Sequence, residues 1–500
     1  MRAVVVLWRL APLLLSFLRD RRRWIVAGRG AFRTPAFHQA RAERLVAVIA
    51  SLGPSFVKLV QVFSARADLI PEPYLGVLGT LTDQVPPVPT PLIEHEIERA
   101  YGRPVREVFE RFDIEPLAAA SLGQVHRARY GGEEVVVKVL RPGVEELVRR
   151  DLATALPVMR RLEQWVPNPH LRNALSVVEE FSVRIWEEMD FVHEAANATE
   201  IRANFAGQRR VVVPRVVTEL VRPRVLVLEY VAGTRVDRLT PGVGGDHRDP
   251  RGVVSSVMEL YLRMMMIDGF FHADPHPGNI LVTPDGRVVL LDFGMVVRVP
   301  RELRWHLVQT VFAAIRRDVD GLLAGFDALG VIAPTANREM VRGLAERLLT
   351  IAYDPAPMEE KVQLVADEVM ATLHDWPVRL PSELVYFART AALIEGLGVR
   401  YDRHFNPITF ATPIALRMRR EIFHSLGMEQ TPAVGLETVV NALLGRGGPR
   451  VDVPALVGAA LGHAAGIFVR AGRQFLAELT RPTVTDNGDG DRRPALLAGD

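Results

Sequence analysis

The fold and chemistry expected of this chain rest on His272-Ala-Asp-Pro-His-Pro-Gly-Asn279, followed by Asp292-Phe-Gly294. Asp274 and Asn279 are five residues apart, and Asp292 follows Asp274 by 18 residues. This spacing is typical of phosphoryl transfer from Mg-ATP. One carboxylate orients or deprotonates the acceptor, while an amide oxygen and a second carboxylate hold the metal. The intervening prolines stiffen the loop, so that it can hold these ligands in place.

Two other interpretations of the same stretch remain open from the sequence. Asp-Phe-Gly on its own is more often an ordinary turn after a strand. His272, Asp274 and His276 could instead form a metal triad, as in a hydrolase. That triad would leave Asn279 and Asp292 without roles.

Lysine is rare in this sequence: Lys58, Lys138 and Lys361 are the only lysines among 61 basic residues. Where arginine supplies most of the charge, a position that stays lysine can require a compact ammonium group. Lys138 lies in a run of valines, 135–139, that predicts a strand. A buried lysine needs anionic partners, and a nucleotide phosphate together with a carboxylate from the amphipathic stretch 181–205 would supply them.

A run of small residues precedes the lysine strand. Turns that lie over phosphates usually contain glycine, because the backbone must approach closely. Here that place is taken by Ala118, Ala119, Ala120 and Ser121. On its own this would be an unremarkable small-residue turn.

The pattern along the chain predicts an α+β protein with a helical extension, a small mixed lobe and a larger helical lobe. A hairpin is expected at 280–282 and 288–291 within the larger lobe. After Asp292-Phe-Gly294 only five residues precede Pro300, a good first residue of a helix. No long activation segment fits in that gap, so a platform for a peptide substrate is expected to be absent.

Composition narrows the function further. The chain has 61 basic and 59 acidic residues and is 48% hydrophobic, which excludes a mainly disordered or fibrous chain. A net charge of +2 provides no global field for nucleic acid, so no nucleic-acid partner is expected. The absence of cysteine excludes disulfides, zinc-thiolate sites and cysteine nucleophiles.

Both ends of the chain suggest contact with a membrane. Residues 4–18 are apolar except for Arg9 and are followed by an arginine cluster, which favours an amphipathic helix on an anionic surface; packing on the protein's own core is the alternative. Residues 453–469 carry no full charge, and glycines recur at every fourth position, at 458, 462 and 466. Such a stretch reaches the lower limit of a membrane span.

Taken in order, these motifs resemble the ABC1/AarF (UbiB) family of atypical protein-kinase-like proteins over roughly residues 45–400. The residues that carry the resemblance are Ala118–Ser121, Lys138, Glu188-Met-Asp190, Glu194, Asp274, Asn279 and Asp292. The resemblance implies a bilobal kinase-like fold that binds ATP and Mg²⁺. It makes Lys138 the nucleotide lysine, Glu194 its helix partner, Asp274 the catalytic-loop aspartate, Asn279 and Asp292 the magnesium ligands, and Glu229 to Val231 the hinge at adenine.

The family also carries Lys-x-Gly-Gln on an N-terminal helical extension that folds over the active site. The matching stretch here is Lys58-Leu-Val-Gln61, in which Val60 replaces the glycine. A branched side chain at this position is expected to alter how closely the helix packs. The resemblance implies that Lys58 pairs with Glu188.

These inferences lead to a specific expectation for the whole chain. The expected units are an amphipathic membrane-surface segment (1–40), a helical extension (41–115), a kinase-like N-lobe (116–230), a kinase-like C-lobe (231–430), an apolar helical region associated with the membrane (431–480) and a disordered tail (481–500). The expected function is Mg-ATP binding with slow hydrolysis or phosphotransfer, coupled to isoprenoid quinone or lipid metabolism at the cytoplasmic face of the cell membrane. Membrane lipids or quinone precursors, a second copy of the chain and a quinone-biosynthesis complex are the expected partners. The alternatives are a small-molecule phosphotransferase of the aminoglycoside or choline kinase type and a non-catalytic, nucleotide-gated scaffold for a lipid-modifying complex.

Overall fold

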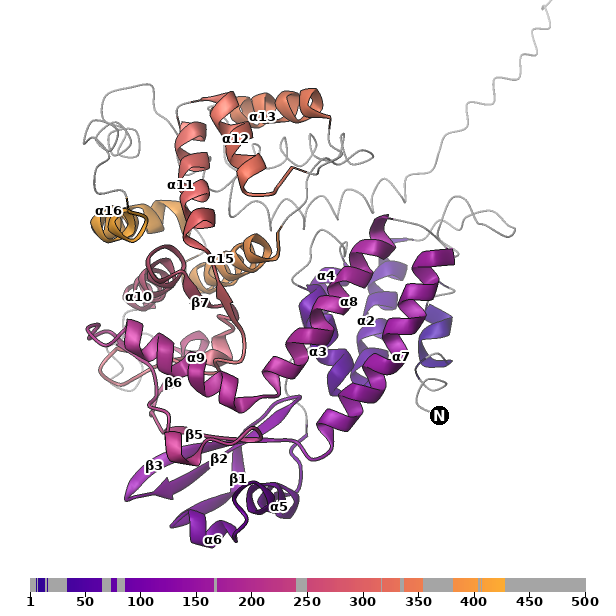
Figure 1. The fold of residues 1–500 in the computed structure, drawn as a ribbon, viewed down its shortest axis with the longest axis vertical. Coiled ribbons are helices and arrows are strands. Elements are labelled where there is room, and N and C mark those ends of the chain that lie inside the picture. The colour runs from indigo at the N-terminus through magenta and orange to yellow at the C-terminus, as the bar shows by residue number, and fades with distance from the viewer. Residues whose placement is uncertain are drawn as a thin grey trace, which may run out of the picture.

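A computed structural model of the chain shows two lobes of mixed composition beside a block of long helices (Figure 1). The structure describes residues 34–64, 73–78, 86–165, 169–239, 250–315, 317–332, 337–353, 381–402, 405 and 407–427, with parts of 6–16. Residues 453–469, expected to contact the membrane, lie outside these ranges. Within the described ranges, no helix combines the length and apolarity that crossing a bilayer would require.

The first lobe is built on an antiparallel sheet in the order β1-β2-β3-β5. Its strands are β1 (Arg111–Ala119), β2 (Gly123–Tyr130), β3 (Glu133–Leu140) and β5 (Val225–Glu229). One face is covered by α5 (Thr90–Tyr101) and α6 (Val105–Val108), whose apolar side chains share a core with this sheet. The sheet begins at Arg111, within the stretch expected to be a helical extension, and the two helices just before it also pack on the lobe.

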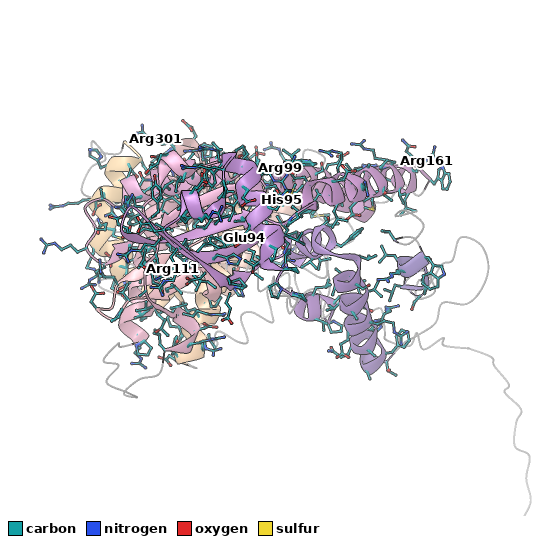
Figure 2. All side chains as sticks on the ribbon, turned by 90° about the horizontal axis from the view of Figure 1, so that it is seen from below. Glu94, His95, Arg99, Arg111, Arg161 and Arg301 are labelled. Atoms are coloured by element: carbon teal, nitrogen blue, oxygen red, sulfur yellow. The ribbon has the colours of Figure 1, made fainter. Side chains whose placement is uncertain are left out.

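Helices inserted after β3 form the block beside the lobes. They are α7 (Val144–Trp165) and α8 (Pro169–Glu188), followed by α9 (Phe191–Asn204), which returns to the sheet. The N-terminal helices α2 (Pro35–Leu52), α3 (Pro54–Ser64) and α4 (Tyr74–Leu78) lie beside α7 and α8 (Figure 1). In Figure 2, Arg161 near the end of α7 lies at the opposite end of the molecule from Arg111 and Arg301 of the lobes.

The described part of the N-terminal segment packs on the protein itself. Val6 and Leu13 are almost fully buried, and Val6 belongs to the same apolar cluster as Leu52 of α2. Arg9, which interrupts the apolar stretch, donates to the backbone oxygen of Ser51 at 3.1 Å and to its hydroxyl at 2.6 Å. These contacts favour the alternative in which this helix covers the protein's own core.

The second lobe combines short strands with helices. A sheet in the order β4-β9-β8-β6 contains β4 (Val211–Val212), β9 (Val288–Leu290), β8 (Ile280–Val282) and β6 (Thr234–Arg235), and a second pair joins β7 (Phe270–His272) to β10 (Val296–Arg298). The predicted hairpin is confirmed, because β8 and β9 pair antiparallel. The helices are α10 (Pro250–Arg263), continued by a π-helical turn η3 (Met264–Asp268), then α11 (Arg301–Ile315), α12 (Val319–Ala328), α13 (Arg338–Tyr353), α15 (Ser382–Tyr401) and α16 (Pro407–Ser425). Short 3-10 turns are η1 (Thr218–Leu220), η2 (Val236–Arg238) and η4 (Pro277–Asn279).

Candidate active site

Strand β3 places Lys138 on the side of the sheet away from α5. Side chains alternate between the two faces of a strand, and Val135, Val137 and Val139 are all buried in the core shared with α5. Lys138 therefore lies on the opposite face, the one that α9 covers. There its ammonium group is 5.3 Å from the centroid of the Phe191 ring.

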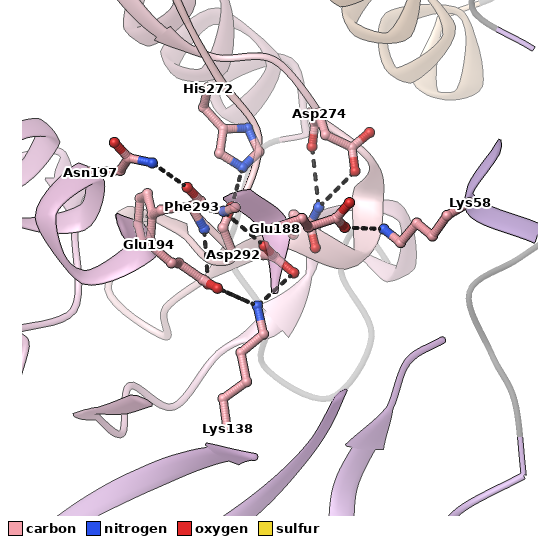
Figure 3. Close-up of polar contacts among 11 residues, drawn as sticks. Lys58, Lys138, Glu188, Glu194, Asn197, His272, Asp274, Asp292 and Phe293 are labelled. Atoms are coloured by element: carbon pink, nitrogen blue, oxygen red, sulfur yellow. Dashed lines mark hydrogen bonds and ion pairs between the residues drawn. The ribbon is translucent and has the colours of Figure 1, made fainter. Parts of the chain in front are cut away.

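The ammonium group of Lys138 joins two carboxylates (Figure 3). Its Nζ donates to both carboxylate oxygens of Glu194 at 2.8 Å, and it lies 3.2 Å from Oδ2 of Asp292. Glu194 is 1% exposed and Asp292 is 45% exposed, so the cluster is closed toward α9 and accessible from the Asp292 side. The predicted pairing of Lys138 with Glu194 is confirmed as a contact.

The position of Glu194 follows from how α9 begins. Asp190 is the N-cap residue, and its carboxylate accepts a hydrogen bond from the backbone N–H of Val192 at 3.0 Å. Such a cap fixes the first turn of a helix. Glu194 therefore lies in the first turn of α9, at a fixed position opposite β3.

Asp274 and Asn279 lie on the loop between β7 and β8. The side-chain amide of Asn279 donates to the backbone oxygen and to Oδ2 of Asp274, both at 3.2 Å. The backbone oxygen of Asn279 accepts from Leu291 at 2.8 Å, which ties this loop to the residue just before Asp292. This hydrogen bond thus joins the end of the loop to the start of the Asp-Phe-Gly segment.

His272 supports the backbone rather than a metal. Its Nε2 is 2.6 Å from the carbonyl oxygen of Asp292, which can only accept, so Nε2–H donates. Its Nδ1 lies 3.0 Å from the hydroxyl of Tyr261, which then donates. Because both ring nitrogens are engaged, the metal triad with Asp274 and His276 is not formed, and no cluster of three such ligands occurs in the described part of the chain.

Helix α3 reaches the site through an ion pair. Nζ of Lys58 is 2.5 Å from Oε1 of Glu188, and their side chains are 15% and 22% exposed. This confirms the pairing implied by the family resemblance. Val60, at the position of the family's glycine, packs against the apolar cluster of the N-terminal helices, so the branched residue is accommodated with the ion pair intact. Gln61 follows on the same helix; its side chain lies outside the described part.

The predicted small-residue turn at 118–121 lies at the end of β1. Ala118 and Ala119 end β1, and the turn through Ala120 and Ser121 is closed by a bond from Ala120 N–H to the oxygen of Gly123 at 2.9 Å. Ser121 is fully buried, so its hydroxyl points into the protein.

The predicted hinge connects the two sheets. Glu229 is the last residue of β5, and the chain continues through Val231 to β6 of the second lobe. The Glu229 carboxylate accepts from the backbone N–H of Arg215 at 3.1 Å. The backbone N–H groups of Glu229 and Tyr230 also donate within the protein, to the carbonyl oxygens of Arg215 at 2.8 Å and of Glu134 at 3.0 Å.

The charges of the cluster shift one another's protonation. Burial alone would lower the pKa of Lys138, but the charges of Asp292 and Glu194 outweigh it and raise that pKa above its ordinary value. Burial raises the pKa of Glu194 to about 7, against the opposing charge of Lys138. Loss of hydration would raise the pKa of Asp292, but Lys138 and then Lys58 hold it well below its usual range.

These properties suit a bound Mg²⁺. Magnesium prefers oxygen ligands and is usually held by one or two carboxylates together with substrate phosphates. Asp292 is ionised and partly exposed, and Asn279 directs its N–H₂ group to Asp274, leaving the amide oxygen as an acceptor. The residues present therefore fit the metal.

Sequence motifs did not single out two polar residues of this region. Asn197 is 5% exposed on α9, and its Nδ2 donates to the carbonyl oxygen of Phe293 at 3.1 Å. Tyr261 is 1% exposed on α10 and contacts His272. The only available signal for Asn197 was its spacing, three residues after Glu194, which places both on one face of the helix.

The fold and the cluster together define a kinase-like protein. The family model of the ABC1 atypical kinase-like domain matches residues 80–325 of this chain. The chain is 32% identical to the probable protein kinase UbiB of Pseudomonas fluorescens over 431 residues, covering 84% of this chain and 80% of that protein. The chain belongs to this ABC1 atypical kinase-like family.

Two further similarities extend the comparison. The chain is 33% identical over 418 residues to the Arabidopsis thaliana chloroplastic protein ACTIVITY OF BC1 COMPLEX KINASE 8, covering 76% of this chain but only 54% of that protein. The chain thus spans about half the length of this plant relative. A solved structure of a Mycobacterium tuberculosis protein with erythromycin aligns with 26% identity and a TM-score of 0.49, covering 72% of this chain and 93% of that one.

Proposed function

We propose that the chain binds Mg-ATP between its two lobes and hydrolyses it slowly or transfers its terminal phosphoryl group. The observation that carries this proposal is the contact of Lys138 with both Glu194 and Asp292. A lysine held between a helix carboxylate and a metal-binding carboxylate is the arrangement that protein kinases need for catalysis. Membership of the kinase-like family supports the same chemistry.

Each residue of the cluster has a distinct role in this proposal. Lys138 would bind the nucleotide phosphates, and Asp292 and Asn279 would hold Mg²⁺, which would neutralise negative charge on those phosphates. Asp274, fixed by Asn279, orients or deprotonates the acceptor. The turn at 118–121 lies over the phosphates, and the backbone at 229–231 meets adenine.

The acceptor in this proposal is a lipid or an isoprenoid quinone precursor rather than a peptide. After Gly294 the chain forms only β10 (Val296–Arg298) before α11 begins at Arg301. A segment this short offers little surface on which an extended peptide could lie. We place the protein at the cytoplasmic face of the cell membrane, where such an acceptor resides, either as a homodimer or within a quinone-biosynthesis complex.

The N-terminal helices argue against the small-molecule phosphotransferase alternative. In this chain α3 is joined to the end of α8 by the pair of Lys58 and Glu188, directly beside the proposed metal site. An open pocket for a freely diffusing aminoglycoside or choline would not require such an extension.

The test is a thermal shift with ATP, with and without Mg²⁺, beside phosphate release. Wild type is expected to be stabilised by Mg-ATP and to release phosphate, and Lys138→Met to lose both, because the phosphate-binding charge is gone. Arg111→Met is the matched control, since it removes an exposed cation from the same sheet. No stabilisation of wild type by ATP would contradict the proposal; stabilisation without any turnover would favour the scaffold alternative.

A further inference from the structure

The backbone at Asp292 has an unusual conformation. Its φ is 58°, in the left-handed region that residues with a side chain seldom adopt. Asp292 and Arg317 are the only such residues other than glycine in the described part of the chain. In this conformation Oδ2 of Asp292 lies 3.2 Å from Nζ of Lys138, so groups that hold the backbone here also position the proposed metal ligand.

Three buried side chains hold consecutive groups of this backbone (Figure 3). His272 donates to the carbonyl oxygen of Asp292 at 2.6 Å. Glu194 accepts from the N–H of Phe293 at 3.2 Å, and Asn197 donates to the carbonyl oxygen of the same residue at 3.1 Å. The peptide group on each side of Phe293 is therefore bonded to a side chain of α9.

Asn197 differs from the other two residues, because the nucleotide chemistry does not otherwise account for it. Glu194 also neutralises Lys138, and His272 belongs to the catalytic loop. Asn197 is 5% exposed and points at the backbone of Phe293 (Figure 3). A buried amide is costly unless it is hydrogen-bonded, so its position is fixed by this contact.

We propose that Asn197 is a positioning residue for the metal ligand Asp292. With Glu194 it forms a clasp, defined here as the two α9 side chains that bind both sides of Phe293. The clasp makes Glu194, the partner of Lys138, and Asp292, the proposed metal ligand, move as one unit. Helix α9 cannot shift away from β3 without releasing the left-handed backbone at Asp292. This inference rests on the proposed function for its nucleotide readout, but the clasp itself is a property of the free protein.

The test compares Asn197→Leu, which keeps the number and branching of the side-chain heavy atoms but loses the donor, with wild type. Hydrogen exchange of the amides at 293–294 in the nucleotide-free protein is expected to rise about tenfold, the order for one net hydrogen bond. The Mg²⁺ concentration that gives half of the ATP-dependent thermal shift should rise about tenfold. ATP binding without Mg²⁺ should change much less, because Lys138 and Glu194 remain.

Ile201→Ala is the matched control, because Ile201 is fully buried on the same helix and contributes only packing. It should lower the melting temperature and leave the Mg²⁺ requirement unchanged. If the leucine variant fails to fold, Asn197→Ser replaces it, because the shorter serine side chain does not reach the carbonyl oxygen of Phe293. The same increases in amide exchange at 293–294 and in the Mg²⁺ requirement are expected.

Unchanged exchange and an unchanged Mg²⁺ requirement in the Asn197 variant would overturn the proposal. An increase matched in full by Ile201→Ala would also overturn it, since a general loss of stability would then explain both. If wild type shows no response to ATP, the proposed function fails, and the exchange measurement alone decides whether the clasp exists.

Discussion

Lys58 of α3 and Glu188 at the end of α8 form an ion pair of 2.5 Å that lies beside the Asp-Phe-Gly segment. A Cβ atom placed on Gly294 would be 3.5 Å from Cγ of Glu188, so this carboxylate packs against the residue two positions after Asp292. The charge of Lys58 also helps to hold the pKa of Asp292 below its usual range. The N-terminal helices are therefore coupled to the proposed metal site by both contact and charge.

Lys58→Ala should destabilise the protein, because Glu188 is left without its counter-charge in a largely buried position. An exposed pair contributes up to about 1 kcal/mol and breaking a fully buried pair costs about 3–5 kcal/mol. With side chains 15% and 22% exposed, we expect a loss of about 1–3 kcal/mol in the free energy of unfolding, measured by chemical denaturation. A double-mutant cycle with Glu188→Gln isolates the pair, and a coupling of zero would show that the two residues act independently.

Lys58→Arg should also lower stability and ATP turnover, although it retains the positive charge. A planar guanidinium group cannot replace a compact ammonium group where the space is fixed by packing. Stability and ATP turnover of this variant are compared with those of wild type. Wild-type behaviour in both would mean that Lys58 is only a surface charge.

The stability of the protein should depend on pH through Glu194. Burial raises the pKa of this carboxyl in the folded protein from 4.5 to about 7, so the folded state retains its proton longer than the unfolded state does. The resulting contribution is complete below about pH 4.5 and is lost as the pH rises through 7. Relative to Glu194→Gln, which mimics the protonated group, wild type should lose up to about 3 kcal/mol across this window.

The measurement is urea denaturation of both proteins between pH 4.5 and 7.5. Glu200→Gln is the control with the opposite sign, because its hydrogen bond to Arg298 lowers the pKa of Glu200. If the free energy of unfolding depends on pH in the same way for wild type and Glu194→Gln, Glu194 has the same pKa in the folded and the unfolded protein.

Binding to anionic liposomes should depend on the C-terminal region more than on the N-terminal one. The described part of residues 6–16 packs against the protein's own helices, whereas residues 453–469 form the uncharged stretch with recurring glycines. The full chain is expected to sediment with the liposomes, and a chain ending at residue 430 to do so much less. Equal sedimentation of the two would rule out the C-terminal region as the anchor.

A carboxylate contact of Lys138 could be predicted, because a lone lysine in a valine strand needs an anionic partner and the stretch 181–205 is acidic. The family resemblance identified that partner as Glu194, and the second contact, with Asp292, was not predicted. The pairing of Lys58 with Glu188 came from the family resemblance, since nothing in the spacing of two residues 130 positions apart requires it. The paired strands β8 and β9 followed from local signals of apolar runs and a turn.

Other features depend on tertiary contacts that leave no local pattern. Helix α5 has the same amphipathic pattern whether it packs on the extension or on the sheet, so its place beneath β3 could not be predicted. Asn197 and Tyr261 are single polar residues among apolar ones, and only the fold shows that they meet the backbone of Phe293 and the ring of His272. The packing of the described part of residues 6–16 was one of two alternatives that the same apolar pattern allowed.

Replacing Asp292 or Asp274 by asparagine should impair different properties of the protein: ATP binding in the first case and turnover in the second. Asp292→Asn removes a charge from the proposed metal site and a partner from Lys138, so Mg²⁺-dependent ATP binding should weaken sharply. Asp274→Asn leaves Asn279 and Asp292 in place, so binding should persist while turnover falls by about 10²–10⁴, the usual contribution of a positioned acid–base group. A thermal shift with ATP, with and without Mg²⁺, beside phosphate release measures both effects. Loss of binding in Asp274→Asn with binding retained in Asp292→Asn would reverse the two roles, and unaffected turnover in both would contradict the kinase-like mechanism.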